Sequence, residues 1–169
     1  FFLEVLQQLT IDKLIRIVYL CINRLGPDYE PGLELGLGET ILIKAISECY
    51  GRETSKIKAD YKSTGDLGLI AQKSRSLQPT MFKTAPLDVD TVFDNSLKIA
   101  KSTGKESQSK KISIIKQMLT ACQMKSSEAK FLIRSLQGKL RIGLAEKSII
   151  VGLAQAFVNY ENKSNKKID

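Results

Sequence analysis

The chain has 169 residues, of which 43% are hydrophobic and 26% charged, a composition typical of one globular domain that needs no disulfide or metal to hold its core together. It contains no histidine and only three widely spaced cysteines, which excludes Ser/His and Cys/His catalysis, imidazole metal sites, CxxC zinc sites and a disulfide framework. The formal net charge is +8, and residues 61–169 carry 19 Lys/Arg against 9 Asp/Glu, which favours a polyanionic partner, although lysines on solvated helix faces give the same totals.

Apolar residues recur every three or four positions through nearly the whole chain, and no segment alternates with a period of two. We therefore predict an all-α, multi-helix fold. The first 20 residues have a helical pattern, in which Thr10 is placed to cap a new helix that ends near Gly26-Pro27. Further helices are predicted over residues 39–50, 54–64, 69–73 (capped by Asp66), 90–101, 109–123, 126–136 and 145–160.

Glycine and proline mark the connections between these helices. Residues 26–38 contain two prolines and four glycines and are predicted to form a loop, and residues 77–88 are predicted to form an exposed connector. Residues 1–160 are expected to form one helical domain, and residues 161–169 a polar, frayed tail or the start of a linker.

Two segments resemble each other at an offset of 72 to 75 residues, over about residues 39–76 and 111–150. Each reads as helix, helix, glycine turn and helix. Gly65 matches Gly138, and Leu67-Gly68-Leu69 matches Ile142-Gly143-Leu144. Two such copies are predicted to pack about a pseudo-two-fold axis that places the glycine turns at related sites, each followed by a helix N-terminus that attracts phosphate. Chance similarity between amphipathic helices is the alternative.

Two basic segments accompany the repeat. Lys139 and Arg141 lie between Gly138 and Gly143, where they could hold phosphates or enter a minor groove. Residues 73–76, with the sequence Lys-Ser-Arg-Ser, offer typical phosphate donors. We expect both segments to face one duplex and form a single cradle; basic helix ends that merely complement their dipole or meet solvent are the alternatives. A third cluster is better explained as a solvated face and consists of Lys105, Lys110 and Lys111.

The sequence shows no set of nucleophile, base and orienting group. It has no GxxxxGK[ST] loop, and its two Lys-Ser-Thr-Gly runs, at residues 62–65 and 101–104, read as helix ends. No stretch reaches 18 apolar residues, so we expect no helix that spans a membrane, and we expect no membrane partner. Because the first residue is Phe1 rather than Met, we expect the chain to be a piece of a longer protein.

Five segments, in this order, resemble the DNA-binding domain of ATP-dependent DNA ligases, and most closely that of the replicative enzymes of eukaryotes. They are residues 32–38 (GLELGLG), 42–45 (LIKA), 65–68 (GDLG), 74–78 (SRSLQ) and 134–146 (RSLQGKLRIGLAE). The resemblance extends roughly from Ile11 to Tyr160. It implies an all-helical domain with pseudo-two-fold symmetry that lies N-terminal to nucleotidyltransferase and OB-fold domains. It also implies that this domain grips nicked double-stranded DNA through the minor groove for sealing in replication, repair and recombination.

The resemblance further implies which residues contact DNA. Residues 138–145 match the family's main DNA-contacting loop, and residues 74–76 match its partner in the other half. With neighbouring cations, the predicted DNA-binding residues are Lys73, Ser74, Arg75, Ser76, Gly138, Lys139, Leu140, Arg141, Gly143, Ala145 and Lys147. With about 6–10 phosphate contacts, binding is expected to weaken roughly 10³–10⁵-fold between 50 and 200 mM salt.

The adenylated lysine of the family lies in a K-x-D-G motif, which this chain lacks. We therefore expect the chain to bind DNA without reacting with ATP and to hold no cofactor, ATP and Mg²⁺ being implied only for the full-length DNA ligase. The Ser-Arg-Ser-x-Gln stretch favours a eukaryotic relative and hence the nucleus. The rival hypothesis is a helical-repeat scaffold that binds an acidic protein partner, and a self-contained enzyme is disfavoured by the missing motifs.

Overall fold

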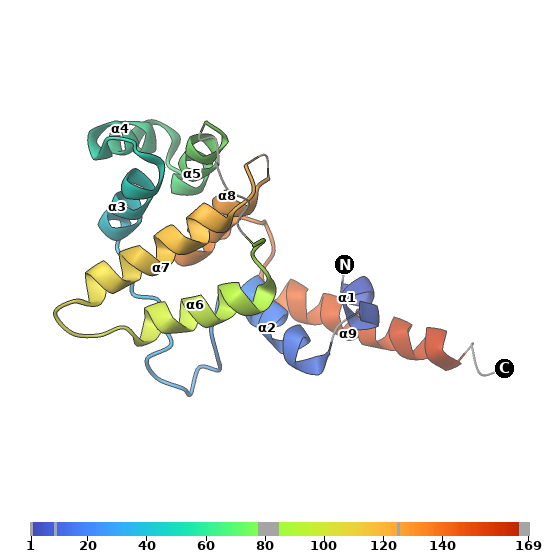
Figure 1. Cartoon of the computed structure of the whole chain (residues 1–169). Helices are drawn as coiled ribbons and strands as arrows, with labels where there is room; N and C mark the ends of the chain where they lie inside the picture. Colours follow the sequence, from blue (N-terminus) through green and yellow to red (C-terminus); the bar gives the residue numbers. More distant parts are fainter. Residues whose placement is uncertain (1, 9, 78–84, 125, 166–169) are drawn as a thin grey trace.

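The computed structural model describes residues 2–8, 10–77, 85–124 and 126–165, which fold into nine α-helices and no strand. The helices are α1 (Phe2–Gln8), α2 (Ile11–Cys21), α3 (Glu39–Tyr50), α4 (Thr54–Thr64), α5 (Leu67–Ser76), α6 (Val89–Lys101), α7 (Ser107–Ala121), α8 (Glu128–Leu136) and α9 (Glu146–Asn165). Helices α3 to α8 gather into one bundle, and α9 extends away from it beside α1 (Figure 1). The predicted all-α fold is confirmed.

Several helix boundaries lie where the capping residues predict them. α4 ends at Gly65, whose φ of 64° is the left-handed conformation that glycine adopts most easily. Asp66 caps α5, because its Oδ1 accepts the N–H groups of Gly68 and Leu69 at 2.9 and 3.2 Å. Thr10, by contrast, occupies the N-cap position of α2 without a side-chain hydrogen bond to that helix.

Two helix ends differ from the prediction. α2 ends before the Gly26-Pro27 pair, because Asn23 already has a φ of 58° and leaves the helical conformation. α9 continues to Asn165, so residues 162–165 are helical rather than frayed, while residues 166–169 lie outside the described residues.

The two predicted loops contain no helix where the structure describes them. Residues 26–38 form turns and extended backbone, and the described parts of residues 77–88 are also non-helical. The central part of that connector, residues 78–84, lies outside the described residues.

The main core lies between α3, α4, α5, α7 and α8, with Ile99 contributed by α6, and in it α3 packs along α7 and α5 along α8. Its most deeply buried side chains are Leu42, Ile46, Ile57, Leu67, Ile99, Ile115, Met118, Leu119, Cys122 and Ile133. The Tyr50 hydroxyl, inside this core, donates to the Leu119 carbonyl at 3.2 Å. All three cysteines are free, as predicted, and Cys122 is fully buried.

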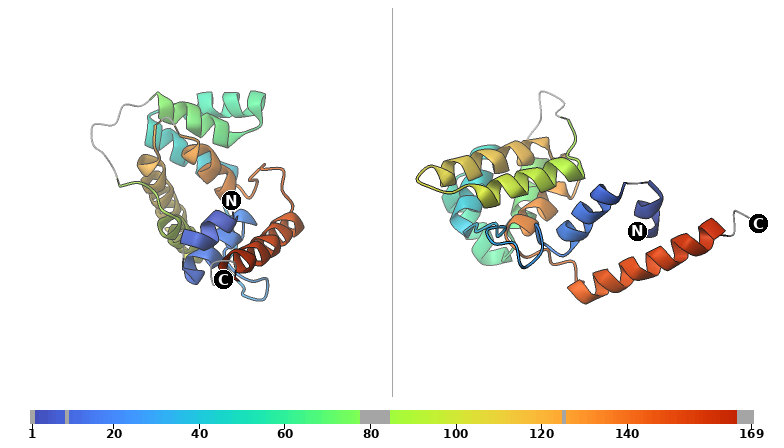
Figure 2. Two further views of the ribbon diagram at one scale, coloured as in Figure 1. Left: turned by 90° about the vertical axis from the view of Figure 1, so that its right-hand side faces the viewer. Right: turned by 90° about the horizontal axis from the view of Figure 1, so that it is seen from below.

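The remaining helices form a second layer beside this core. Ion pairs join α2 to α6, since Nη1 of Arg16 lies 2.9 Å from Asp94 and 3.2 Å from Asp90. α1 packs against α9 at the far side of α2, and α9 leads away from the bundle in the right-hand view of Figure 2. The chain reaches this C-terminal helix through the segment between α8 and α9.

The two repeat halves have the same order of elements, but their third helices, α5 and α9, are placed differently. α3 and α7, the first helices of the two halves, pack against each other. α5, however, begins directly after the Gly65 turn and packs on α8, whereas an extended segment separates Gly138 from α9. The match of residues 67–69 with residues 142–144 is therefore wrong, because the first set opens a helix and the second set forms a bent loop.

Gly68 lies where α5 packs closely against α8. A Cβ there would lie 2.5 Å from the Lys130 carbonyl oxygen and 2.8 Å from Cγ of Arg134. Replacing a helical glycine with alanine normally stabilises by about 1 kcal/mol. Here the clash involves the α8 backbone, so we expect Gly68→Ala to lower the free energy of unfolding by about 2 kcal/mol. Gly152→Ala in α9, where a Cβ meets Phe2 at 3.8 Å, is the control and is expected to stabilise slightly. Urea denaturation of both variants distinguishes the two signs.

Candidate nucleic-acid interface

The two glycine turns that the sequence matched lie beside each other. At Gly138, φ is 75°, and the Lys139 N–H donates back to the Arg134 carbonyl at 2.9 Å, which ends α8. The chain then turns towards the end of α4, where Nη2 of Arg141 donates to the Gly65 carbonyl at 2.7 Å. The two turns are therefore joined directly by a side chain of one and the backbone of the other.

A second contact fixes the same junction. The Tyr61 hydroxyl in α4 donates to the Glu39 carboxylate at the start of α3, and Nε2 of Gln137 lies 3.1 Å from the Tyr61 oxygen and 3.2 Å from Glu39 Oε1. The hydrogen bond to Glu39 raises the pKa of Tyr61, and burial adds to the effect. The end of α8 is thus held against α3 and α4 immediately before the Gly138 turn.

The segment from Gly138 to Ala145, which we call the basic loop, is exposed throughout except for the half-buried Leu140. It presents Lys139 and Arg141 together with Ile142 and Leu144, whose side chains are 40% and 59% exposed. Exposed cations next to exposed apolar side chains suit a surface of phosphates and deoxyriboses.

Residues beyond each end of the basic loop tie it to the rest of the chain. At its start, the Lys139 N–H contact holds it to α8. At its end, Glu146 Oε2 lies 3.1 Å from Nη2 of Arg24, and Lys147 is exposed in the first turn of α9. Lys139, Arg141 and Lys147 are thus presented on a segment that is anchored on both sides.

Asp66 is the one acidic side chain buried at this junction in the part of the chain that the structure describes, with 3% of its surface exposed. Nε and Nη2 of Arg134 donate to its Oδ2 at 3.1 and 2.5 Å, and Nη1 of Arg141 lies 3.8 Å away. Burial raises the pKa of Asp66, but hydrogen bonds from Arg134 and from the Leu69 and Gly68 N–H groups outweigh it and hold the pKa below its ordinary value. Asp66 is therefore ionised, and two arginines offset its charge.

Acid should weaken this junction. The pKa of Asp66 is lower in the folded chain than in the unfolded chain, so its contribution to stability is present at neutral pH and is lost as the pH falls below the ordinary value of 3.8. We expect Asp66→Asn to be less stable than wild type at pH 7 by about 3 kcal/mol, because Arg134 loses its buried partner. The difference should shrink steadily below pH 4, which denaturation at a series of pH values measures; a constant difference would mean that the Asp66 charge does not stabilise the fold.

Ser74 and Arg75 do not lie where the prediction needs them. Their exposed fractions are 1% and 5%. The Ser74 hydroxyl donates to the Ile70 carbonyl and accepts a hydrogen bond from Arg52, both inside the domain. Nε of Arg75 donates to the Cys122 carbonyl at 2.7 Å and Nη2 to the Thr120 carbonyl at 3.2 Å, so its guanidinium satisfies carbonyls at the C-terminus of α7. The prediction that these two side chains form the second side of a surface cradle is wrong.

Other predicted residues keep their place on the surface. Lys73 and Ser76 are exposed on α5. Of the third basic cluster, Lys111 donates to the Leu35 carbonyl at 3.4 Å and so helps to hold the loop of residues 26–38. Lys105 and Lys110 are exposed, in keeping with the solvated face predicted for this cluster, whereas Lys111 is half-buried.

The exposed end of α4 was missed as a site. The segment that the sequence interpreted only as a helix end does end α4, but its Lys62, Ser63 and Thr64 are exposed next to the carbonyl that Arg141 binds. The match between the two glycine turns was the available signal, since it pointed to the residues before Gly65 as well as to those after Gly138.

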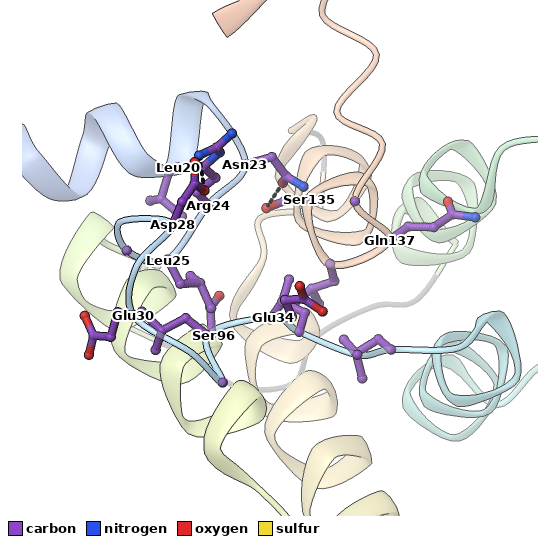
Figure 3. A pocket seen from close by; sticks show the side chains of 18 of the residues that line it. Leu20, Asn23, Arg24, Leu25, Asp28, Glu30, Glu34, Ser96, Ser135 and Gln137 are labelled. Carbon is purple, nitrogen blue, oxygen red and sulfur yellow. Dashed lines mark hydrogen bonds and ion pairs between the residues drawn. The ribbon is translucent and has the colours of Figure 1, made fainter.

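A hollow lies on the other side of Gly138, between the loop of residues 23–38 and the end of α8 (Figure 3). Asn23 and Ser135 meet across its rim in a 3.0 Å hydrogen bond. Carboxylates of Asp28, Glu30 and Glu34 line it, which disfavours an anionic ligand there. The hollow is therefore lined by acidic side chains, in contrast to the cations of the basic loop.

Within residues 2–8, 10–77, 85–124 and 126–165, no group of three or more Cys, Asp or Glu side chains is placed to hold a metal ion. None of the helices described is both long and apolar enough to cross a bilayer.

Comparison with known proteins places this arrangement in a family. Residues 1–154 match the model for the DNA ligase N terminus. The chain is 54% identical to DNA ligase 1 of Saccharomyces cerevisiae over 169 residues, which are 100% of this chain and 22% of that protein. It is 51% identical to DNA ligase 1 of Schizosaccharomyces pombe over 91% of this chain and 20% of that protein. It is 34% identical to the DNA ligase of Pyrobaculum calidifontis over 86% of this chain and 25% of that protein.

The chain therefore spans about a quarter or less of the length of these relatives. The family match covers the core, the Gly65 turn and the basic loop in one continuous range. The chain belongs to the DNA ligase N-terminal family.

Proposed function

We propose that this chain is the DNA-binding module of an ATP-dependent DNA ligase and that it holds nicked double-stranded DNA through the minor groove while other domains seal the break in replication and repair. Those domains would be the nucleotidyltransferase and OB-fold domains of the same longer chain, which would use ATP and Mg²⁺ and act in the nucleus. The chain itself has no K-x-D-G motif and so no lysine of the kind that is adenylated in such enzymes.

The observation that carries this proposal is the hydrogen bond from Arg141 to the Gly65 carbonyl. It brings the exposed end of α4, with Lys62, next to the basic loop, with Lys139 and Arg141. Cations from two distant parts of the sequence thereby share one surface, which suits the two phosphate backbones that border a minor groove.

The chemistry of this surface favours phosphate contacts over reading of bases. Arginine has five N–H donors, and the contact of Arg141 with Gly65 uses one of them, so others remain for a phosphate oxygen. Lys139 acts as a point charge, and Ile142 and Leu144 supply apolar contact with sugars. Affinity should therefore depend little on base sequence.

Binding to a labelled nicked duplex, compared with binding to an acidic polypeptide of the same total charge, tests the proposal. We expect the full 169-residue chain to bind the duplex more tightly, with similar affinity for duplexes of unrelated sequence. Tighter binding to the polypeptide would favour the alternative, a helical scaffold for an acidic protein. Incubation with labelled ATP is expected to leave no covalent adduct on the chain, and an adduct would contradict the assignment of catalysis to other domains.

A further inference from the structure

Arg141 has an unusual backbone conformation. Its φ is 53°, in the left-handed region that residues with a Cβ rarely adopt. This conformation directs the side chain back towards α4 and α5, where it meets the Gly65 carbonyl and approaches Asp66. The side chain therefore has two defined partners within the chain, although it is 45% exposed.

Asp66 contacts three separate parts of this junction. It caps α5 through two backbone N–H groups, its Oδ2 accepts two hydrogen bonds from Arg134 in α8, and the same Oδ2 lies 3.8 Å from Arg141. Arg134 in turn supplies the carbonyl that holds the Lys139 N–H at the start of the basic loop. A single buried carboxylate thus connects the base of the loop to the arginine at its centre.

We propose that Asp66 is a positioning residue, which fixes the basic loop in its binding conformation through Arg134 and Arg141 before DNA arrives; this inference rests on the proposed function. A loop fixed in advance loses less conformational freedom on binding than a mobile one, so its affinity is higher. Asp66 does not itself touch the ligand in this arrangement, because it is buried beneath the loop.

If Asp66 acted on DNA only through its charge, removing that charge would change the affinity in the opposite direction. Asp66 carries a negative charge beneath a surface that would face phosphates, so its neutralisation should strengthen binding if charge alone mattered. If Asp66 positions the loop, its neutralisation should weaken binding. The sign of the change therefore separates the two roles.

Asp66→Asn in the full 169-residue chain is the test, because asparagine caps a helix as well as aspartate does and changes only the charge and the arginine contacts. The matched control is Asp60→Asn in α4, where the carboxylate pairs with Arg52 at 2.7 Å and the same charge is removed. We expect Asp66→Asn to bind a nicked duplex about tenfold more weakly, and Asp60→Asn to bind at least as tightly as wild type.

A second readout reports on the loop without DNA. Trypsin cleaves after Lys139 and Arg141, so the cleavage rate in the folded chain, followed by mass spectrometry well below the unfolding temperature, measures how often the loop opens. We expect faster cleavage in Asp66→Asn and wild-type cleavage in Asp60→Asn. If Asp66→Asn does not fold, Asp66→Glu, which keeps the charge and displaces the carboxylate, is expected to show the same weaker binding and faster cleavage.

The possible outcomes separate the two proposals. Wild-type cleavage in Asp66→Asn, or duplex binding equal to or tighter than wild type, would overturn the positioning role. Failure of the wild-type chain to bind duplex would overturn the proposed function, and the cleavage rates would still decide whether Asp66 fixes the loop.

Discussion

Duplex binding is expected to weaken about 500-fold when the salt concentration rises from 50 to 200 mM. The exposed cations that we expect to meet phosphates are Lys62, Lys73, Lys139, Arg141 and Lys147. If each neutralises one phosphate, the slope of log K against log salt is about −4.5, since each contact with B-DNA contributes about −0.9. This is a smaller effect than the sequence alone predicts, because five phosphate contacts are counted in place of about 6–10.

Fluorescence anisotropy with a labelled nicked duplex at five or more salt concentrations measures this slope. Arg141→Ala is expected to make the slope about one unit shallower for every duplex sequence. Lys105→Ala, an exposed lysine in the turn between α6 and α7, is the control and should leave the slope unchanged. That turn lies at the end of the bundle remote from α9 (Figures 1 and 2). An unchanged slope in Arg141→Ala would remove Arg141 from the binding surface.

The helices were predictable because local signals determine where they begin and end. Gly65 ends α4 through its own left-handed conformation, and Asp66 caps α5 through N–H groups two and three residues ahead. The departure of α9 from the repeat was not predictable in this way. It depends on α9 packing against α1 instead of against its own half, which is a contact between opposite ends of the chain.

The same distinction applies to the candidate site. The basic loop could be recognised from glycines and cations within a few residues of each other, and it is exposed as its composition suggests. Its neighbour at the end of α4 could not, because the Arg141 contact with Gly65 spans 76 positions of the sequence. Local pattern reveals which residues can bind, and tertiary packing decides which of them share a surface.

Arg75 shows the reverse case, in which local pattern places a buried residue on the surface. A cation in the last turn of a helix, next to Lys73, Ser74 and Ser76, has the composition of a phosphate site. Its burial depends on the end of α7 lying beside it, with the Thr120 and Cys122 carbonyls aimed at the guanidinium. The negative end of the α7 dipole favours a cation there without a carboxylate partner.

Arg75→Ala is therefore expected to act on stability and not on DNA binding. The change removes donors from two carbonyls at the end of α7 and leaves a cavity in place of a side chain of which 5% is exposed. We expect the free energy of unfolding to fall by about 3 kcal/mol, because the buried Cys122 carbonyl loses its donor and the packing of the side chain is lost as well. Chemical denaturation measures this loss, and the salt slope of duplex binding by the folded fraction should equal that of wild type.

Lys73→Ala, two positions earlier on the same helix, is the matched control. Lys73 is exposed, so its removal should change stability by less than about 0.5 kcal/mol, and it should make the salt slope shallower by about one unit. The two neighbours thus have opposite expected effects on the two measurements. If Arg75→Ala kept wild-type stability and made the slope shallower, the guanidinium would have to leave the end of α7 to meet DNA.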